Sequence, residues 1–427
     1  MKKILYILLA IVLFQSCQKE SFEYVIYKPT VEDIDSIYFS TGSKTLIADG
    51  KASLNFVIET FRKVRIANAI GQQKDTLMFV DYKTLPHSDI KIYANGSLIK
   101  DMIYKTTNST ANNIEFYAEI GNQKSVKKLV EIRQPQGIPQ KIVVDVVFHV
   151  FELSITDVSY DPLRYQSITS TQLQDAISYA NAIFNNSVGN DANSGNANIE
   201  FRLAKTNASG AALAIPGYNR IQYDATWKTS ATAASFTIAN FTSRINSTVA
   251  YQWNKDKFLN IYVIPSSPNN SIGNNRANYQ IVKLSETPLL GITNVVNSQA
   301  NVPTTDFYTN YGLGIHRSVF FPDPSRQIEI AGYLGLYYGL YATHTTGTAV
   351  LDYVNDTNKY LSGTNQSFNN TLSLYKLSVY GEKFLANNAM DDIRYASLRN
   401  TFTIGQVERM RLVMERSPVR TAWVKSN

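Results

Sequence analysis

The apolar run KIVVDVVFHVFEL at Lys141–Leu153 is the feature that most limits the fold of this 427-residue chain. It is nearly continuous and rich in β-branched residues, whereas a strand with one exposed face alternates apolar and polar positions. Such a run predicts a strand that is covered on both faces. The chain around it must therefore supply other elements to cover the sheet that contains it.

The residues that follow this run alternate between helical and extended patterns. Thr403 with Gln406 can form a capping box at the start of a late helix, and Thr169 with Gln172 can do so at the start of the helix that follows the apolar run. The apolar stripe of that helix contains Leu173, Ile177, Ala180 and Phe184. Ala197–Ala204 and Phe258–Ile264 read as strands, and Phe236–Trp253 as a helix at least in part. This order predicts strands and helices packed in layers.

Residues 22–133 predict a separate β-rich domain. Short β-branched and aromatic runs separated by turn residues occur at Phe22–Lys28, Ala52–Thr60, Leu77–Tyr82, Ile90–Ala94, Ile114–Ile120 and Lys127–Arg133. Six or seven such strands predict a small sandwich, and Leu46–Val57 resembles the opening of bacterial Ig-like repeats. Residues 134–140 contain two Pro and one Gly and predict a linker. We therefore expect an α+β protein of two domains, at 22–133 and 141–427.

The N-terminus has the pattern of a bacterial lipoprotein signal. Two lysines precede the apolar run Ile4–Phe14, which is too short for a typical membrane-spanning helix. The run leads into Phe14-Gln15-Ser16-Cys17, which resembles a relaxed lipobox, and Cys17 is the only Cys of the chain. We expect residues 1–16 to be removed and Cys17 to carry a lipid. The protein would then be anchored to the bacterial outer membrane, on its periplasmic or surface face.

Charge and composition exclude few functions. The formal charge is +7, but no block of Lys and Arg with interleaved aromatic residues is present. Nucleic-acid binding is therefore not expected. The sequence carries no signal for the oligomeric state.

The stretch Arg326–Gly347, RQIEIAGYLGLYYGLYATHTTG, decides the functional reading. Its frame resembles the zinc-binding helix of the metzincin metallopeptidases, H-E-x-x-H-x-x-G-x-x-H. In that pattern two His one helical turn apart bind Zn²⁺ and the Glu polarises the metal-bound water. The Gly ends the helix, so that the chain can bring up a third His.

The residues that carry the chemistry of this pattern are replaced. With Gly339 on the Gly of the motif, Gly332, Leu336 and Ala342 stand at the three His positions and Tyr333 at the Glu position. Gly, Leu and Ala have no ligand atom in their side chains, and a neutral Tyr does not replace a carboxylate base. The frame of the motif is retained without its ligands.

The order of the surrounding segments resembles the pappalysin-like metzincins. VFHV, ANIEF and LNIYV precede the helix, as strands of this kind do in that family. After it, Leu351–Asn358 resembles the D-x-V-x-D-T-P loop, with Asn in place of Pro. Asn388–Asp391 resembles the Met-turn, with Met390 beneath the metal site, and Phe402–Arg420 resembles the closing segment. The resemblance covers Lys141–Arg420 and implies a metzincin-like domain with a mixed sheet, long helices and a Met-turn.

These residues predict an exported lipoprotein of pappalysin-like fold that is not a catalyst, a pseudoenzyme of the metallopeptidase class. We expect no catalytic residue and no bound zinc, and a cleft lined by Tyr333, Leu336 and Tyr337 that binds a polypeptide or cell-surface ligand. If the backbone frame is intact, His at 332, 336 and 342 with Glu at 333 should restore zinc binding.

Three alternatives stay open. His344, two residues beyond the third ligand position, is an alternative zinc ligand in a weak one-His site with Asp352 or Asp356. The same two carboxylates, with loop carbonyls, are candidates for calcium. If His344 and these acids hold zinc, the protein is an active zinc-dependent metalloendopeptidase with an atypical metal site. Alternatively, it is a structural or adhesive surface protein that acts through its Ig-like domain.

The lipobox predicts the fate of a Cys17→Ala variant. Without the thiol no lipid can be attached, so the protein should be released from membranes or accumulate as an uncleaved precursor. Membrane fractionation with mass spectrometry of the mature N-terminus measures this. A correctly processed Cys17→Ala protein that stays with membranes would contradict the lipoprotein assignment.

Overall fold

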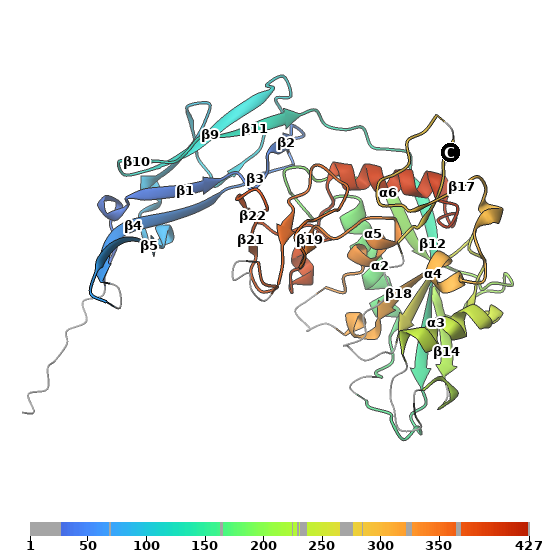
Figure 1. Ribbon diagram of the computed structural model, residues 1–427. Helices are drawn as coiled ribbons and strands as arrows, with labels where there is room; N and C mark the ends of the chain where they lie inside the picture. Colours follow the sequence, from blue (N-terminus) through green and yellow to red (C-terminus); the bar gives the residue numbers. More distant parts are fainter. Residues whose placement is uncertain are drawn as a thin grey trace, which may run out of the picture. The chain divides into compact units, whose positions relative to one another are not determined.

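The computed structural model describes residues 27–67, 70–162, 165–223, 225–228, 230, 237–264, 276–283, 285–321, 327–363 and 369–425 (Figure 1). The signal segment 1–16 and Cys17 lie outside these residues. By internal contacts the chain forms two units, one from 1–37, 59–90 and 119–124, the other from 38–58, 91–118 and 125–427. Three pieces of the segment 22–133 thus belong to the second unit, and the expected domain boundary at 134–140 stays a prediction.

The first unit is organised around one antiparallel hairpin. Strand β4 (Val57–Ala67) pairs with β5 (Gln73–Val80), with Phe61 opposite Phe79, and β1 (Ser36–Ser40) lies along the other side of β4. The rings of Phe61 and Phe79 meet edge to face at 6.1 Å. A cross-strand aromatic pair of this kind stabilises the hairpin.

A six-stranded sheet has the order β2-β11-β9-β6-β7, with β10 paired to β9, and most of its residues come from the N-terminal pieces of the second unit. Its strands are β2 (Thr45–Ile47), β6 (Ile90–Ala94), β7 (Ser97–Ile99), β9 (Asn113–Ile120), β10 (Gln123–Lys124) and β11 (Lys128–Arg133). Strands β3 (Leu54–Asn55) and β8 (Ile103–Tyr104) form a separate pair. The region is β-rich, as expected, while its Ig-like topology stays a prediction.

The centre of the second unit is strand β12 (Ile142–Leu153), the apolar run of the sequence. Its sheet has the order β13-β12-β15-β18, and β14 and β23 also pair with β12. The partners are β13 (Ile199–Leu203), β14 (Tyr218–Tyr223), β15 (Leu259–Ile264), β18 (Gly312–His316) and β23 (Val424–Lys425). Only β23 is antiparallel to β12, so the sheet is mixed and the protein is α+β, as predicted.

Both faces of this sheet are covered, which confirms the interpretation of the apolar run. Alternate side chains from Val144 to Val150 pack in one core with α2 (Ser170–Phe184), α5 (Ala331–Tyr337) and α6 (Ile404–Arg416). Phe151 and Leu153 point to a second core, which includes residues of α3 (Ile238–Ser247) and α4 (Phe307–Tyr311). The site described below lies at α5, in the first of these layers.

The expected capping boxes start the two longest helices. Thr169 accepts from the backbone of Gln172 at α2, and Thr403 accepts from that of Gln406 at α6. In each case the Gln side chain accepts in return from the backbone N–H of the Thr, at 2.9 Å. The sequence pattern therefore located these helix starts correctly.

Short strand pairs complete the second unit. Parallel pairs are formed by β16 (Tyr279–Ile281) with β17 (Asn294–Val296) and by β19 (His344–Thr345) with β20 (Tyr360–Leu361). Strands β21 (Tyr375–Leu377) and β22 (Lys383–Leu385) form an antiparallel hairpin. In the described parts of the chain, no helix is long and apolar enough to cross a membrane.

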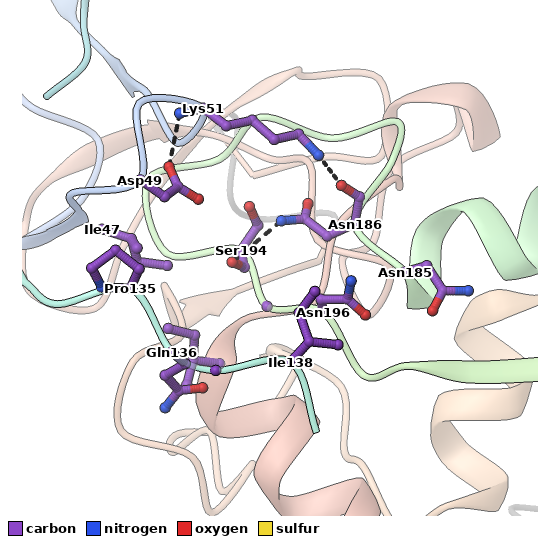
Figure 2. Close-up of a pocket in the computed structure, with 13 residues that line it drawn as sticks. Ile47, Asp49, Lys51, Pro135, Gln136, Ile138, Asn185, Asn186, Ser194 and Asn196 are labelled. Carbon is purple, nitrogen blue, oxygen red and sulfur yellow. Dashed lines mark hydrogen bonds between the residues drawn. The ribbon is translucent and has the colours of Figure 1, made fainter. Parts of the chain in front are cut away.

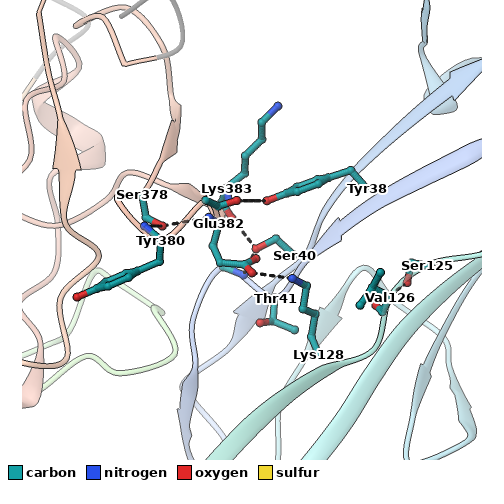
Figure 3. Close-up of polar contacts among 12 residues, drawn as sticks. Tyr38, Ser40, Thr41, Ser125, Val126, Lys128, Ser378, Tyr380, Glu382 and Lys383 are labelled. Atoms are coloured by element: carbon teal, nitrogen blue, oxygen red, sulfur yellow. Dashed lines mark hydrogen bonds and ion pairs between the residues drawn. The ribbon is translucent and has the colours of Figure 1, made fainter. Parts of the chain in front are cut away.

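The hairpin β21–β22 contacts the N-terminal pieces of the second unit (Figure 3). The Tyr38 hydroxyl donates to the carbonyl of Gly381 at 3.2 Å and accepts from the Lys383 N–H at 2.7 Å. Lys128 forms an ion pair with Glu382 at 2.6 Å. These contacts explain why Tyr38–Ile58 and Ser125–Arg133 belong to the same unit as the large sheet.

The expected linker 134–140 also contacts α6. The Gln136 side-chain amide donates to Glu408 at 2.8 Å, and Arg411 donates to the Gln140 carbonyl at 2.9 Å. Residues 135–138 form one side of a cavity of about 230 Å³, shown in Figure 2. The carboxylate of Asp49 in its wall already accepts from two backbone N–H groups. None of the candidate site residues lines this cavity.

His149 is a buried histidine of the central strand. Its Nδ1 lies 2.8 Å from the side-chain amide nitrogen of Asn219, and its Nε2 lies 2.8 Å from Oδ1 of Asn260. Because an amide NH₂ only donates, the neutral ring carries its proton on Nε2. Burial lowers the pKa of His149 to about 4.

This buried histidine predicts a pH-dependent stability. The unfolded ring takes up a proton below about pH 6.5 and the folded ring only below about 4, so the unfolded state binds more protons between these values. The stabilisation is complete above pH 6.5 and is lost as the pH falls to 4, by about 3 kcal/mol at most. Urea unfolding at pH 7.5 and 5 should show a smaller pH effect in His149→Gln than in wild type. The exposed control His87→Gln should keep the wild-type difference, and equal pH effects in all three proteins would contradict this assignment.

Candidate functional site

A cavity of about 350 Å³ lies over helix α5. All four positions that replace the metzincin ligands and base line it: Gly332, Tyr333, Leu336 and Ala342. The other residues of its wall are Arg276, His344, Ala389, Met390, Asp391, Asp392 and Arg399. The four aligned positions therefore line one cavity, whose wall comes from three segments of the chain.

Helix α5 ends as the motif requires. Gly339 has φ +81°, its N–H donates to the Leu336 carbonyl at 3.0 Å, and the Leu340 N–H donates to the Gly335 carbonyl at 2.9 Å. These two bonds form a Schellman motif, for which a glycine without a Cβ is suited. A Cβ at Gly339 would in addition lie 2.8 Å from the Val413 side chain. The expected role of this glycine is confirmed.

The floor of the cavity is a turn at residues 388–391. The Asp391 carboxylate accepts from the Asn388 N–H at 3.0 Å and from the Thr343 hydroxyl at 2.5 Å. Asn388 in turn exchanges hydrogen bonds with Gln406 of α6. Met390 is 5% exposed and faces the cavity from this turn. The turn is thus held in place by hydrogen bonds of its own side chains.

Helix α5 and this turn approach each other closely. A Cβ built at Gly332 would lie 2.7 Å from the carbonyl oxygen of Ala389, a contact that real side chains do not make. A Cβ at Gly335 would lie 3.0 Å from the Met390 sulfur. A His at position 332 therefore requires the turn to move. The recovery of zinc binding by His at 332, 336 and 342 therefore depends on that movement and stays a prediction.

The residues at the site do not fit a zinc ion. Three of the four aligned positions have no ligand atom, and the fourth, Tyr333, has a phenol whose pKa is raised by burial and by the nearby Glu329. That group stays neutral at pH 7 and is not a base. Among the described residues, no three His, Cys, Asp or Glu side chains are grouped so that they could hold a metal ion. No step through a metal follows from this geometry.

A buried ion pair lies beside the cavity. Glu329 is fully buried at its side chain and lies 2.8 Å from a terminal nitrogen of Arg399, without the alignment of a hydrogen bond. Its other oxygen accepts from the Gly332 N–H at 2.9 Å. Burial raises the pKa of Glu329, while Arg399 and the N–H groups of Gly332 and Ala331 oppose the rise. The carboxylate therefore accepts from the first N–H groups of α5 and pairs with Arg399, and it is not directed at a substrate.

His344 lines the cavity, as one of the alternatives required. Its ring stacks on Tyr360 at 5.7 Å and its Nδ1 lies 3.1 Å from the Ser362 hydroxyl. Burial lowers the pKa of His344, against the effect of Asp392. Burial also raises the pKa of Asp391 to about 7. The ring is therefore neutral near pH 7, and Asp391 is charged only in part.

The proposed calcium ligands are bound to protein groups. Asp352 forms an ion pair with Lys359 at 2.9 Å and accepts from the hydroxyl of Thr357. Asp356 accepts from the Thr403 hydroxyl at 2.7 Å and from the Gly405 N–H at 2.9 Å, at the start of α6. A carboxylate at a helix N-terminus stabilises that helix. Both residues thus have a structural use, and a calcium ion there stays a prediction.

Tyr337 does not line the cavity, contrary to expectation. It is 3% exposed, its hydroxyl donates to the Tyr311 carbonyl at 3.3 Å, and its ring stacks under the guanidinium of Arg420 at 3.6 Å. One helical position separates it from Leu336, and that rotation of about 100° turns it into the core. The expectation counted it among the cleft residues because it is an aromatic neighbour of Leu336.

Three polar residues of the wall were not found from the sequence. Arg276 and Arg399 lie in segments without a motif, and Asp392 follows the segment that resembles the Met-turn. No spacing in the sequence connects them with the helix pattern. Only the folded chain brings them to the cavity.

Part of this chain matches a known family of peptidases. Residues 243–415 match the family of peptidases M43, described as pregnancy-associated plasma protein-A. This segment is pappalysin-like. It contains α5, the turn at 388–391 and most of α6, so the matched part of the chain includes the whole cavity.

Solved structures with a weak likeness to this chain are those of mirolysin and its precursor. Mature mirolysin of Tannerella forsythia in complex with a cleaved peptide has 21% identity and a TM-score of 0.45, over 67% of this chain and 96% of that one. A promirolysin mutant of the same organism has 20% identity and a TM-score of 0.42, over 67% and 86%. These weak likenesses assign no activity. None of the curated proteins matches the chain.

The close contact at α5 predicts the effect of one methyl group. Gly332→Ala should lower the free energy of unfolding by about 1–3 kcal/mol, because its Cβ collides with the Ala389 backbone. Gly347→Ala is the control, since a Cβ there would meet only the Thr345 hydroxyl at 3.5 Å. Urea unfolding of the three proteins measures the difference. A stability of Gly332→Ala equal to that of the control would show that the turn moves freely.

Proposed function

We propose that this protein is a non-catalytic relative of the pappalysin-like peptidases and binds a polypeptide segment in the cavity over α5. The observation that carries the proposal is that Gly332, Tyr333, Leu336 and Ala342 all face this one cavity. The substitutions thus fall on the place where the family holds its metal. They leave an intact, shaped site and remove the chemistry from it.

The packing at α5 supports the loss of metal chemistry independently of the alignment. At position 332 the backbone of Ala389 occupies the space of a side chain. A ligand His needs room for its imidazole and its Cβ. The close packing leaves no such room, so it is consistent with Gly at this position. An ancestral metal site would require a wider gap at this point.

The character of the cavity supports a peptide as ligand. Its volume of about 350 Å³ is in the range of sites that hold a small molecule or one or two amino-acid side chains. Leu336 and Met390 supply apolar surface, and Arg276, Asp392 and Arg399 supply charged groups. A polypeptide segment offers both kinds of group within a few bonds.

The remaining parts of the proposal concern placement in the cell. A lipid on Cys17 would hold the protein at the outer membrane, and residues 22–133 would act as an Ig-like spacer or adhesive module. Asn388–Asp391 would be the family's Met-turn, which here supports a binding cavity and not a metal. A cell-surface polypeptide is then the ligand class that fits both location and site.

Metal analysis and peptide binding test the proposal together. Purified protein should contain less than about 0.1 mol of zinc per mol, because structural or catalytic zinc needs three or four good ligands. A pool of fluorescein-labelled, C-terminally amidated random heptapeptides should bind and should be displaced by the unlabelled pool. Ala342→Phe, which fills the cavity, should weaken this binding about tenfold or more.

Ala349→Phe is the matched control, because Ala349 is exposed and outside the cavity wall. Stoichiometric zinc together with peptidase activity that EDTA abolishes would support the active-enzyme alternative and overturn the proposal. Peptide binding that Ala342→Phe leaves unchanged would move the binding site to another surface, such as the N-terminal sheets.

A further inference from the structure

We propose, on the basis of the proposed function, that the cavity recognises a carboxylate of its peptide ligand through Arg276. The ligand class is then an acidic polypeptide or a polypeptide with a free C-terminus. The inference rests on the pairing of the charged groups around the cavity, taken one by one.

Arg276 is the cation of the wall that has no protein acceptor among the described residues. Its guanidinium lies on the ring of Tyr341 at 4.0 Å from the centroid. Its Nε is buried and forms no hydrogen bond there. Buried donors are normally satisfied, so an unpaired one at the wall of a cavity marks a place for an acceptor from outside.

The ring under Arg276 is firmly placed. The Tyr341 hydroxyl donates to the Gly291 carbonyl, and the ring of Tyr353 meets that of Tyr341 edge to face at 5.0 Å. A planar guanidinium that lies on a fixed ring keeps its N–H groups in one orientation. Arg276 is therefore preorganised before a ligand arrives.

A second cation raises the positive potential at the same ring. Arg409 lies 5.5 Å from the centroid of Tyr341, and it donates to the carbonyls of Gly339 at 2.8 Å and Leu290 at 2.7 Å. Its donors are thus used within the protein, and the nearby Asp352, which itself pairs with Lys359, offsets its charge only in part. An anion near Arg276 gains from both charges.

The acids near the cavity do not pair with Arg276. Glu329 pairs with Arg399, and Asp391 accepts from Thr343 and Asn388 and is protonated in part. No ion pair joins Arg276 to these acids or to Asp392 within the described residues. The guanidinium is therefore free to take a carboxylate by two parallel N–H···O bonds. Leu336 and Met390 supply the apolar surface for the carbon atoms next to that carboxylate.

Three labelled hexapeptides distinguish the sources of the carboxylate. They share the sequence Ala-Gly-Leu-Xaa-Ala-Gly with fluorescein at the N-terminus. The first has Glu at Xaa and an amidated C-terminus, the second has Gln and a free C-terminus, and the third has Gln and an amidated C-terminus. Fluorescence polarisation with the full-length protein should show the first or the second binding about tenfold more tightly than the neutral third.

Variants of Arg276 decide whether this residue is responsible. Arg276→Gln should remove the preference for the charged peptide, and Arg276→Lys should restore part of it. The control Arg202→Gln makes the same change of net charge at a distant ion pair with Asp145 and should keep the preference. Thermal unfolding confirms that each variant is folded.

The outcomes separate this inference from the proposed function. If the neutral peptide binds as well as the charged ones, or if Arg276→Gln keeps the preference, the carboxylate inference is overturned. The proposed function stands in that case as long as Ala342→Phe blocks the binding. If none of the three peptides and none of the random heptapeptides binds, both proposals fail.

Discussion

The close packing of Gly332 against the Ala389 carbonyl determines what the cavity over α5 can be. A Cβ at position 332 would lie 2.7 Å from that oxygen, so helix and turn are nearer than any side chain at 332 allows. Interiors pack at high density, and a gap without a metal or an imidazole tends to close. The glycine therefore allows the short distance between α5 and the turn, and this distance limits which side chains fit at the other replaced positions.

Other interactions connect the elements that a metal would otherwise join. The pair of Glu329 and Arg399 links the start of α5 to the segment after the turn. Thr343 links the chain beyond α5 to the turn through Asp391. Because Glu329 is buried, its pair with Arg399 must be maintained; a buried charge without its partner would be strongly destabilising. These polar contacts supply the cross-links, whereas a peptidase of this class would supply them through its ion.

Much of the frame followed from the sequence, because it depends on local patterns. The apolar run at Lys141–Leu153, the two capping boxes and the helix end at Gly339 are each set by neighbours within a few residues. The four positions that replace the metal ligands and the base were found because they also belong to a local pattern. The direction of side chains and the contacts between distant segments did not follow from the sequence. Tyr337 points into the core, and Arg276 and Arg399 reach the cavity only through tertiary folding. The ion pair of Lys128 with Glu382 likewise joins residues that no local pattern connects.

The packing must also explain why the cavity over α5 stays open. A larger side chain at position 342 could fill the space, yet Ala342 is small and about 350 Å³ remains. The wall also keeps Arg276 and Arg399, each with a buried Nε that has no acceptor among the described residues. Leaving such donors unpaired costs about 1–3 kcal/mol each. An open cavity with unsatisfied donors is the arrangement expected of a site that is completed by a ligand, and it is difficult to reconcile with a purely structural remnant.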